Sequence, residues 1–396
     1  MPLQDLKKKA ETLSDYMSAL RRRIHKNPEL GFQEKDTSAL VRKELTSLGV
    51  TLAPLEIETG VVGLLPGRGQ GPGTVTALRA DMDALPIAEK TGLAYASQNP
   101  GVMHACGHDG HVAMLLGAAR LLSEMTDAFS GAVKFFFQPA EELLTGAKKM
   151  MESNCLKNPE VDRLVAVHGW PDMEVGKIGV YPGPYMASAD RFEISIQGAG
   201  GHGGYPHRSR DPIIAAAHTV VALQSIISRE TDPLDQAVLS VCTFSAGQAF
   251  NVIPDQALLG GTVRCLERRV RADLQKKMRR VVESIPRAFG CEGRLEWTGL
   301  VPSLVNDPET SGIVSEVGES VLGRGCMERL PGPVMGSEDF AAYLEQVPRG
   351  ALFRVGLKGA GREVKPLHNS GFDFNDEALP VGASVLAGVV LRFHSS

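Results

Sequence analysis

The sequence predicts an α/β protein in which a mostly parallel sheet, flanked by helices, carries an inserted α+β domain. Near-continuous apolar segments alternate with helical patterns before residue 187 and again after residue 302, as in a buried parallel sheet. Between residues 188 and 301 the order becomes β-α-β-β-α-β, which matches the ferredoxin-like pattern. A chain of 396 residues is also long for one domain. We therefore expect a discontinuous first domain, 1–187 plus 302–396, and an inserted domain, 188–301.

The first domain contains the elements that build the expected sheet. Its strands are predicted at 61–65, 74–79, 132–137, 164–167 and 351–355. Its helices are predicted at 4–23, 36–48, 110–125, 145–152, 308–322 and 380–393. Asp36 is a plausible N-cap of the second helix. The basic run Arg21–Arg23 is interpreted as a solvated helix end, where positive charge suits the helix dipole.

The inserted domain offers three candidate functional residues. Its strands are predicted at 191–197, 237–244, 257–264 and 294–298, and its helices at 211–229 and 267–288. His202 lies among four glycines in the loop 198–204, so we expect it to be exposed. Arg264 ends a strand and Asn251 precedes that strand. The two are either ordinary surface residues or a clamp for a carboxylate.

Composition and charge narrow the class of protein. The net charge of −4, with interspersed signs, argues against nucleic acid or an anionic membrane as the main partner. The chain has no basic segment followed by an apolar signal core, and no uninterrupted apolar run of about 18 residues, so we expect a cytoplasmic protein. Six scattered cysteines without a C-x-x-C pair indicate reduced thiols.

The densest group of metal-binding side chains is the octet HACGHDGH at residues 104–111. Imidazole and thiolate are the ligands that borderline divalent metals prefer. Asp81, Glu141, Glu142 and His168 follow the ends of three predicted strands, and ligands of parallel sheets bind beyond these carboxyl ends. His368 follows a further strand and its loop, from which it could reach the same edge. The sequence therefore predicts a metal site there.

The remaining histidines and the paired acids receive different interpretations. His218 lies in an apolar helix and is expected to be a core residue, while His25, His207 and His394 are assigned to structure or surface. His104 and His111 are expected to support true ligands rather than bind metal. Glu141 and Glu142 are adjacent, so their side chains point in different directions. One carboxylate could bind metal while the other activates a water molecule.

The motifs together resemble those of a known superfamily. They are RADMDALP (79–86), HACGHDGH (104–111), QPAEE (138–142), HGW (168–170), GGHGG (200–204) and MGSEDF (335–340). In this order they resemble the aminoacylase/carboxypeptidase superfamily. Within it, they are most similar to the amidohydrolase branch of hippurate hydrolases, indole-3-acetyl-amino acid hydrolases and N-acyl-L-amino acid amidohydrolases. The resemblance spans nearly the whole chain.

The resemblance implies a metal site of defined composition. Two divalent ions per subunit would be held by Cys106, His108, Glu142, His168 and His368, with Glu141 as general base. Such mixed ligands suit Zn²⁺ or Mn²⁺ and also accommodate Co²⁺ or Ni²⁺. Asp83 matches the aspartate of a His-x-Asp motif found in other branches, and Asp81 stands in place of the histidine ligand. We expect Asp81 and Asp83 to orient ligands rather than bind metal.

The resemblance also implies a reaction and an assembly. The substrate would be an N-acyl amino acid, hydrolysed to a carboxylic acid and a free amino acid. The inserted domain would be a lid and dimerisation module of a homodimer or a dimer-based tetramer. His202 would reach a partner's site to stabilise the oxyanion, and Asn251 with Arg264 would bind the substrate carboxylate. The alternatives are a dipeptidase or carboxypeptidase of the same superfamily and a non-catalytic metal-binding protein.

Overall fold

The computed structural model describes residues 3–71, 73–361 and 364–394, which form two compact units. Unit 1 runs to Gly183, resumes over Val305–Gly332 and continues from Asp339. Unit 2 comprises Pro184–Leu304 and Pro333–Glu338. The segment 333–338 was expected in the first domain, but Val334 forms a β-bridge with Met186 and accepts a hydrogen bond from Ala187. These backbone contacts place it in unit 2.

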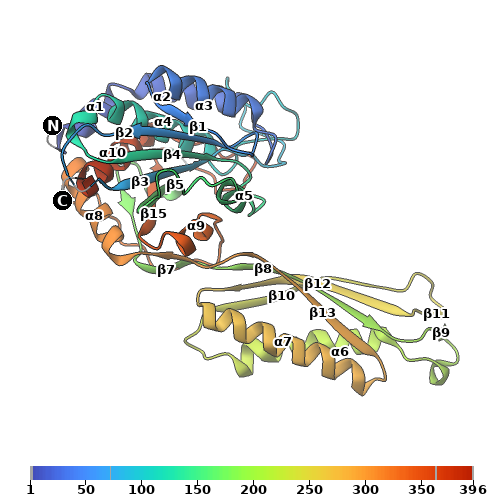
Figure 1. The fold of residues 1–396 in the computed structure, drawn as a ribbon. Helices are drawn as coiled ribbons and strands as arrows, with labels where there is room; N and C mark the ends of the chain where they lie inside the picture. Colours follow the sequence, from blue (N-terminus) through green and yellow to red (C-terminus); the bar gives the residue numbers. More distant parts are fainter. Residues whose placement is uncertain (1–2, 72, 362–363, 395–396) are drawn as a thin grey trace. The chain divides into compact units, whose positions relative to one another are not determined.

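Unit 1 is built on a seven-stranded sheet of order β1-β2-β4-β3-β5-β15-β6 (Figure 1). The strands are β1 (Thr51–Ala53), β2 (Val61–Pro66), β3 (Val75–Asp81), β4 (Ala132–Gln138), β5 (Arg163–Glu174), β6 (Ile178–Gly179) and β15 (Gly350–Lys358). The central strands β4, β3, β5 and β15 are parallel, while β1, β2 and β6 pair antiparallel at the edges. Strands β3 and β4 are buried throughout, which explains their unbroken apolar sequence.

Helices cover both faces of this sheet. They are α1 (Asp5–Glu11), α2 (Ser14–Lys26), α3 (Lys35–Ser47), α4 (His108–Ser123), α5 (Gly146–Glu152), α8 (Pro308–Leu322), α9 (Phe340–Gln346) and α10 (Leu379–His394), with 3₁₀ turns at Thr126–Ala128 and Asp376–Ala378. Helices α2, α4 and α10 pack together over one face, and α5 with α9 lies on the other (Figure 1). Side chains of α4 and α10 fill the main core.

Three predictions about the helices of unit 1 were wrong in detail. The helix expected at 4–23 is two helices, because the hydroxyls of Thr12 and Ser14 bond back to carbonyls of the preceding turn. Helix α3 begins at Lys35 rather than after Asp36, whose backbone N–H donates to Glu29. In the basic run, only Arg22 and Arg23 are exposed; the side chain of Arg21 is fully buried.

Unit 2 contains a four-stranded antiparallel sheet of order β10-β12-β8-β13. Its elements are β8 (Ala189–Gln197), α6 (Pro212–Ser225), β10 (Ala237–Ala246), β12 (Gln256–Cys265), α7 (Arg268–Ala288) and β13 (Glu292–Val301). Pro206–Arg208 is a 3₁₀ turn and Ile226–Glu230 is a π-helical turn. The strand order and the β-α-β-β-α-β order of elements along the chain together form the split β-α-β arrangement, as the amino-acid sequence predicts. Strands β9 (Gly201–His202) and β11 (Val252–Ile253) pair antiparallel in a short two-stranded ribbon. Strands β7 (Gly183–Met186) and β14 (Leu304–Asn306) form another two-stranded pair at the points where the chain passes from one unit to the other.

Among the described residues, two helical stretches are long and apolar enough to cross a membrane by length and composition, Pro212–Glu230 and Asp376–His394. Residues of the second are 89% buried within unit 1, as expected for a core helix. In the first, which contains α6, only 33% of the tested window is buried. His218 was expected in its core but is exposed and stacks on Phe289, with ring centroids 4.7 Å apart. Because α6 is apolar nearly all round, its sequence does not reveal the buried face.

Candidate metal centre

Three central strands bring polar residues to one edge of the sheet in unit 1. Asp81 ends β3 and pairs in register with Gln138, which ends β4. On the neighbouring strand β5, His168 pairs with Arg354 of β15. Since Arg79 is level with Ala166 across β3 and β5, His168 lies near the height of Asp81. The topology therefore gathers these residues near the carboxyl ends of β3 and β4. His168 was expected just after a strand ending at residue 167, but it lies within β5, which continues to Glu174.

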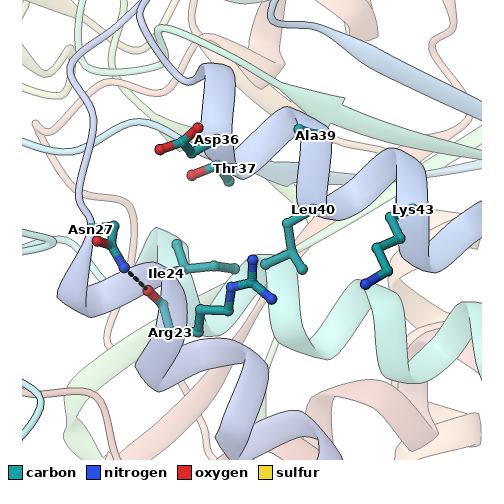
Figure 2. Close-up of a pocket in the computed structure, with 8 residues that line it drawn as sticks. All are labelled: Arg23, Ile24, Asn27, Asp36, Thr37, Ala39, Leu40 and Lys43. Atoms are coloured by element: carbon teal, nitrogen blue, oxygen red, sulfur yellow. Dashed lines mark hydrogen bonds between the residues drawn. The ribbon is translucent and has the colours of Figure 1, made fainter.

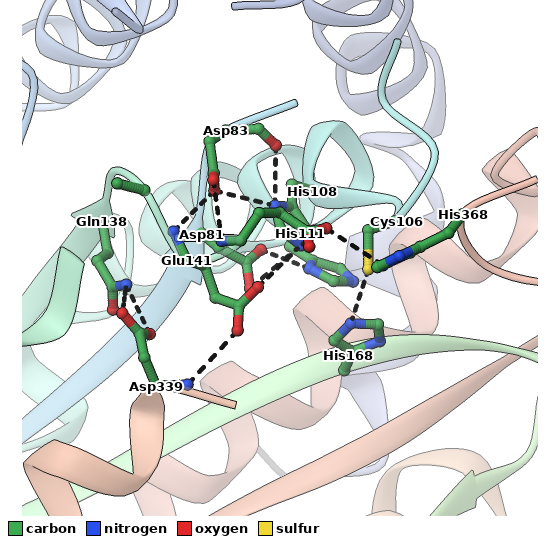
Figure 3. A network of polar contacts seen from close by, with 12 residues as sticks. Asp81, Asp83, Cys106, His108, His111, Gln138, Glu141, His168, Asp339 and His368 are labelled. Atoms are coloured by element: carbon green, nitrogen blue, oxygen red, sulfur yellow. Dashed lines mark hydrogen bonds and ion pairs between the residues drawn. The ribbon is translucent and has the colours of Figure 1, made fainter. Parts of the chain in front are cut away.

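The octet 104–111 supplies two donors from a sharp turn at the start of α4. Gly107 has a φ of 87°, a left-handed conformation that costs a residue with a side chain more than glycine. A Cβ atom at this position would lie 3.0 Å from the ring of Phe374. The turn leaves Cys106 before the helix and His108 as its first residue. Both side chains are buried and face the sheet edge (Figure 3).

The hydrogen bonds of His108 and His168 leave one nitrogen of each ring available. His108 Nδ1 donates to the backbone carbonyl of Asp83 at 2.9 Å, and its Nε2 is buried without a hydrogen-bond partner. His168 Nδ1 donates to the carbonyl of Gly169 at 2.8 Å, while its Nε2 lies 3.6 Å from Cys106 Sγ. A backbone carbonyl that accepts from Nδ1 orients each ring with Nε2 toward the donor cluster, and a metal ion would bind through this nitrogen.

Glu142 and His368 complete the donor set. Glu142 Oε1 is buried without a hydrogen-bond partner, 4.0 Å from His108 Nε2 and 3.3 Å from His368 Nε2. His368 has a φ of 62°, a rare conformation for a side-chain-bearing residue. Its backbone N–H donates to the carbonyl of Ala105 at 2.8 Å, which ties it to the octet. The five residues form overlapping groups whose donor atoms lie within 4.8 Å of one another.

The electrostatics of this cluster suit cations. Burial keeps the pKa of His168 well below its usual value, so this imidazole is neutral and able to bind. Burial also raises the pKa of the Cys106 thiol, which a metal would reverse by binding the thiolate. The neighbouring Cys106 and Glu142 raise the pKa of His368 to about 10, because both favour a positive charge at this position. Orphaned nitrogen and oxygen donors around this point fit divalent ions.

Asp81 and His111 are close to the donors, and each is already hydrogen-bonded to its neighbours. His111 Nδ1 donates to Asp81 Oδ1 at 2.6 Å, and its Nε2 accepts from the backbone N–H of Gly169 at 2.8 Å. Asp81 Oδ2 accepts from Arg79 at 2.6 Å. The geometry thus agrees with supporting roles for both residues, although Asp81, His108 and His111 also form a compact donor group.

Two carboxylates hold the loop that carries Glu141 and Glu142. The two oxygens of Asp83 accept from the backbone N–H groups of Glu141 and Glu142, each at 3.0 Å. Glu34 Oε1 accepts from Ala140, which has a φ of 54°, at 2.9 Å. Burial and the nearby Asp83 carboxylate raise the pKa of Glu34 to about 7. Glu34 was not predicted as a site residue. It precedes a helix, and no local sequence signal shows that its carboxylate accepts a hydrogen bond from a loop 106 residues away.

A second network fixes the side chain of Glu141 (Figure 3). Arg79 donates to Gln138, Asp81 and Asp339 and is almost fully buried. Gln138 and the backbone N–H of Ala147 also donate to Asp339, whose own backbone N–H lies 3.4 Å from Glu141 Oε1. Glu141 Oε2 is 4.0 Å from His108 Nε2. Glu141 therefore faces the donor cluster, and Asp339 belongs to the site although no role was predicted for it.

In unit 2, His202 and Asn251 share the short ribbon. His202 pairs with Val252, and the carbonyl of Asn251 accepts from Gly203 at 2.8 Å. The His202 ring is exposed, and its Nδ1 accepts from the backbone N–H of Gly204 at 2.9 Å, which leaves Nε2–H as an outward donor.

Arg264 is not beside them. It lies near the opposite end of β12 from Gln256, roughly 25 Å along a strand that rises about 3.3 Å per residue. It donates instead to Ser337. The structure thus joins Asn251 to His202 and does not bring it to Arg264 within unit 2.

A surface hollow lies elsewhere in unit 1. A cavity of about 380 Å³ separates α2 from α3 and is lined by Arg23, Ile24, Asn27, Asp36, Thr37, Ala39, Leu40 and Lys43 (Figure 2). None of the donor residues described above lines it. The metal-binding chemistry therefore does not coincide with this hollow.

A cluster of thiol, imidazole and carboxylate donors at a sheet edge, with the Glu141 carboxylate facing it, is the arrangement of a metal-dependent hydrolase. Residues 77–392 match the family described as Peptidase family M20/M25/M40. The N-acetylcysteine deacetylase of Bacillus subtilis (strain 168) is 41% identical over 93% of this chain and 94% of its own. The IAA-amino acid hydrolase ILR1-like 4 of Arabidopsis thaliana is 40% identical over 96% of this chain and 86% of its own.

A solved structure agrees with these relatives. The crystal structure of the Bacillus subtilis YXEP protein, described as a dinuclear metal-binding peptidase from the M20 family, has a TM-score of 0.84. It is 36% identical and covers 97% of this chain and 99% of its own. The chain belongs to the M20 peptidase family and is a metal-dependent amidohydrolase.

Proposed function

We propose that the protein hydrolyses N-acyl amino acids to a carboxylic acid and a free amino acid. The observation that carries this proposal is the pairing of a metal-donor cluster with Glu141, whose carboxylate faces the cluster beside the donor Glu142. Relatives named for N-acetylcysteine deacetylation and for hydrolysis of IAA-amino acids support an acylated amino acid as substrate.

Cys106, His108, Glu142, His168 and His368 would hold two divalent ions, Zn²⁺ or Mn²⁺ by preference, with Co²⁺ or Ni²⁺ also compatible. Bound there, the ions would lower the pKa of a water molecule and polarise the amide carbonyl. Glu141 takes the proton of the attacking water on its carboxylate and returns it to the leaving nitrogen. Asp81 and Asp83 hold their neighbours in place by the hydrogen bonds described above.

His202 supplies the donor for the oxyanion that forms on the amide. Its Nε2–H points outward because Nδ1 already accepts from Gly204. We propose that a partner subunit provides it within a homodimer, or a tetramer built of dimers, assembled through the inserted lid domain. Asn251 lies beside His202 on the same ribbon, so it would reach the partner's site together with His202. Arg264 on β12 would bind the substrate carboxylate.

A panel of substrates tests the reaction. Apoprotein reconstituted with Zn²⁺, Mn²⁺, Co²⁺ or Ni²⁺ is assayed on N-acetyl and N-benzoyl amino acids and on dipeptides. The proposal expects kcat/KM for acylated amino acids to exceed that for dipeptides at least tenfold. The reverse order would assign the protein to the dipeptidases or carboxypeptidases. No turnover of any substrate by fully loaded protein would indicate a metal-binding protein without catalysis.

A further inference from the structure

A buried charged cluster outside the donor set surrounds Arg21 of α2. The Arg21 side chain is fully buried, and its Nε donates to Asp109 Oδ2 at 2.8 Å. Its second terminal nitrogen, Nη2, donates to Asp373, and Nη1 lies 3.4 Å from Asp376. One guanidinium therefore contacts three carboxylates from two distant parts of the chain.

Further contacts make the cluster rigid. Asp109 Oδ2 also bonds His25 Nδ1 at 2.8 Å, and His25 Nε2 lies 3.4 Å from Glu89. Asp109 and Glu89 outweigh the effect of burial and raise the pKa of His25 to about 9, so this ring carries a second positive charge. Tyr95 donates its hydroxyl to Asp373 at 3.0 Å.

The location of these carboxylates relates the cluster to the metal centre. Asp109 directly follows His108 in the chain, while Asp373 and Asp376 belong to the segment that follows His368. Burying an arginine costs desolvation free energy, and an apolar side chain of similar volume would often stabilise the fold as well or better. The cluster is therefore explained better by its holding the octet 104–111 against the segment that follows His368 than by a gain in folding stability.

We propose that Arg21 is a positioning residue of the metal centre, whose guanidinium fixes the octet 104–111 against the segment carrying His368. This inference rests on the ligands proposed above. Arg21 joins the octet to the segment that carries His368, and only the ion bound through His368 has ligands from both. We therefore expect the affinity for this ion to depend on Arg21 more than the affinity for the ion held mainly by His108 and His168.

The test substitutes Arg21→Lys and, as a matched control, Arg23→Lys. Lysine keeps the charge but is a point donor that cannot span three carboxylates. Arg23 lies on the same helix with its side chain in the surface hollow (Figure 2). Zn²⁺ binding to each apoprotein is measured by competition with a chromogenic chelator, alongside thermal unfolding of the apoprotein.

We expect Arg21→Lys to weaken one of two Zn²⁺ sites by about 10- to 100-fold, the usual effect of losing a group that orients ligands. Saturating Zn²⁺ should restore most of kcat with KM unchanged, and Arg23→Lys should bind as the wild type does. Unchanged affinity at both sites would overturn the proposal, and so would a lower melting temperature with unchanged affinity.

Two further variants keep the test decisive. If Arg21→Lys does not fold, Asp373→Asn on the rim of the cluster removes one charge and should weaken the same site; wild-type affinity in the folded Asp373→Asn protein contradicts the proposal. Cys106→Ser tests the ligand assignment separately. Wild-type Zn²⁺ affinity in Cys106→Ser overturns the proposed ligands, whereas weakened binding there with normal binding in Arg21→Lys overturns only the role of Arg21.

Discussion

The functional residues of the two units differ in how firmly the protein holds them. In unit 1, His108 and His168 are each oriented by a backbone carbonyl, and the loop carrying Glu141 and Glu142 is anchored by three backbone hydrogen bonds to carboxylates. In unit 2, His202 sits on an exposed two-residue strand and is oriented by one hydrogen bond from Gly204. Asn251 beside it is also exposed.

This difference suits two kinds of chemistry. Metal donors must be placed before the ion arrives, because each misplaced ligand weakens binding. A donor to an oxyanion is needed only in the transition state and can be brought by a moving or separate element. We therefore expect changes in unit 1 to alter metal binding and proton transfer, and changes in unit 2 to alter turnover or substrate binding with the metal in place.

The largest effect is expected for Glu141→Gln compared with Glu142→Gln. Loss of the general base should lower kcat by about 10²- to 10⁴-fold while metal content stays at the wild-type level. Glu142→Gln should instead lower metal content, because its Oε1 lies among the donors. Elemental analysis with steady-state kinetics separates the two. Equal metal loss in both variants would contradict the division of roles between these adjacent acids.

His202→Ala should lower kcat by about 10²- to 10³-fold, the range for removing one oxyanion donor, with no change in metal content. If a partner subunit supplies this histidine, a verified heterodimer of His202→Ala and Glu141→Ala chains regains activity, because one of its sites is intact. A heterodimer as inactive as its parents would show that His202 does not act in trans.

Arg264→Met should raise KM for an N-acyl amino acid by about 10- to 100-fold, since hydrogen bonds to a charged group contribute roughly 1.5–3 kcal/mol. The matched control is the same substrate with its carboxyl group converted to an amide. For that compound, wild type and variant should differ less than twofold. A similar loss on both substrates would remove Arg264 from carboxylate binding.

The smallest effect concerns pH and Glu34. Its pKa in the fold is about 7 against an ordinary value of 4.5, so the folded state binds the proton more tightly than the unfolded chain. This contribution to stability is complete below pH 4.5 and is lost as pH rises through about 7. It amounts to roughly 3 kcal/mol at 1.36 kcal/mol per pKa unit. Urea unfolding of apoprotein should show Glu34→Gln losing less stability than wild type between pH 5 and 8. Parallel pH profiles would contradict the assignment.

The sequence predicted those parts of the site whose positions follow from the order of the strands alone. Asp81 and His168 come together because the parallel strands β3 and β5 are in register, although β5 continues past His168 to Glu174 and does not end at residue 167 as expected. The sequence could not show that both nitrogens of His111 are already bonded, since one partner is a backbone N–H on another strand. Glu34 and Asp339 were missed because their partners are backbone N–H groups far away in the chain, that of Ala140 in a loop and that of Ala147 in α5.

The burial of Arg21 could have been predicted from helical periodicity, but the basic composition of its run was given more weight. The run Arg21–Arg23 was interpreted as a solvated helix end, yet Arg21 and His25 are four residues apart. They share a helix face with the buried Met17 and Ile24. Helical periodicity therefore separates Arg21 from Arg22 and Arg23, whereas composition treats the three alike. Charged residues on the apolar face of a helix mark buried networks.

The proposed mechanism requires two divalent ions in unit 1 for amide hydrolysis. Titration of metal-free protein with Zn²⁺ or Mn²⁺, with bound metal and hydrolysis of an N-acetyl amino acid followed together, tests this requirement. We predict that activity is absent without metal and reaches its maximum at two bound ions per chain, whereas Cys106→Ser stays below this occupancy. Full activity without metal, or a maximum unaffected by Cys106→Ser, would contradict the claim.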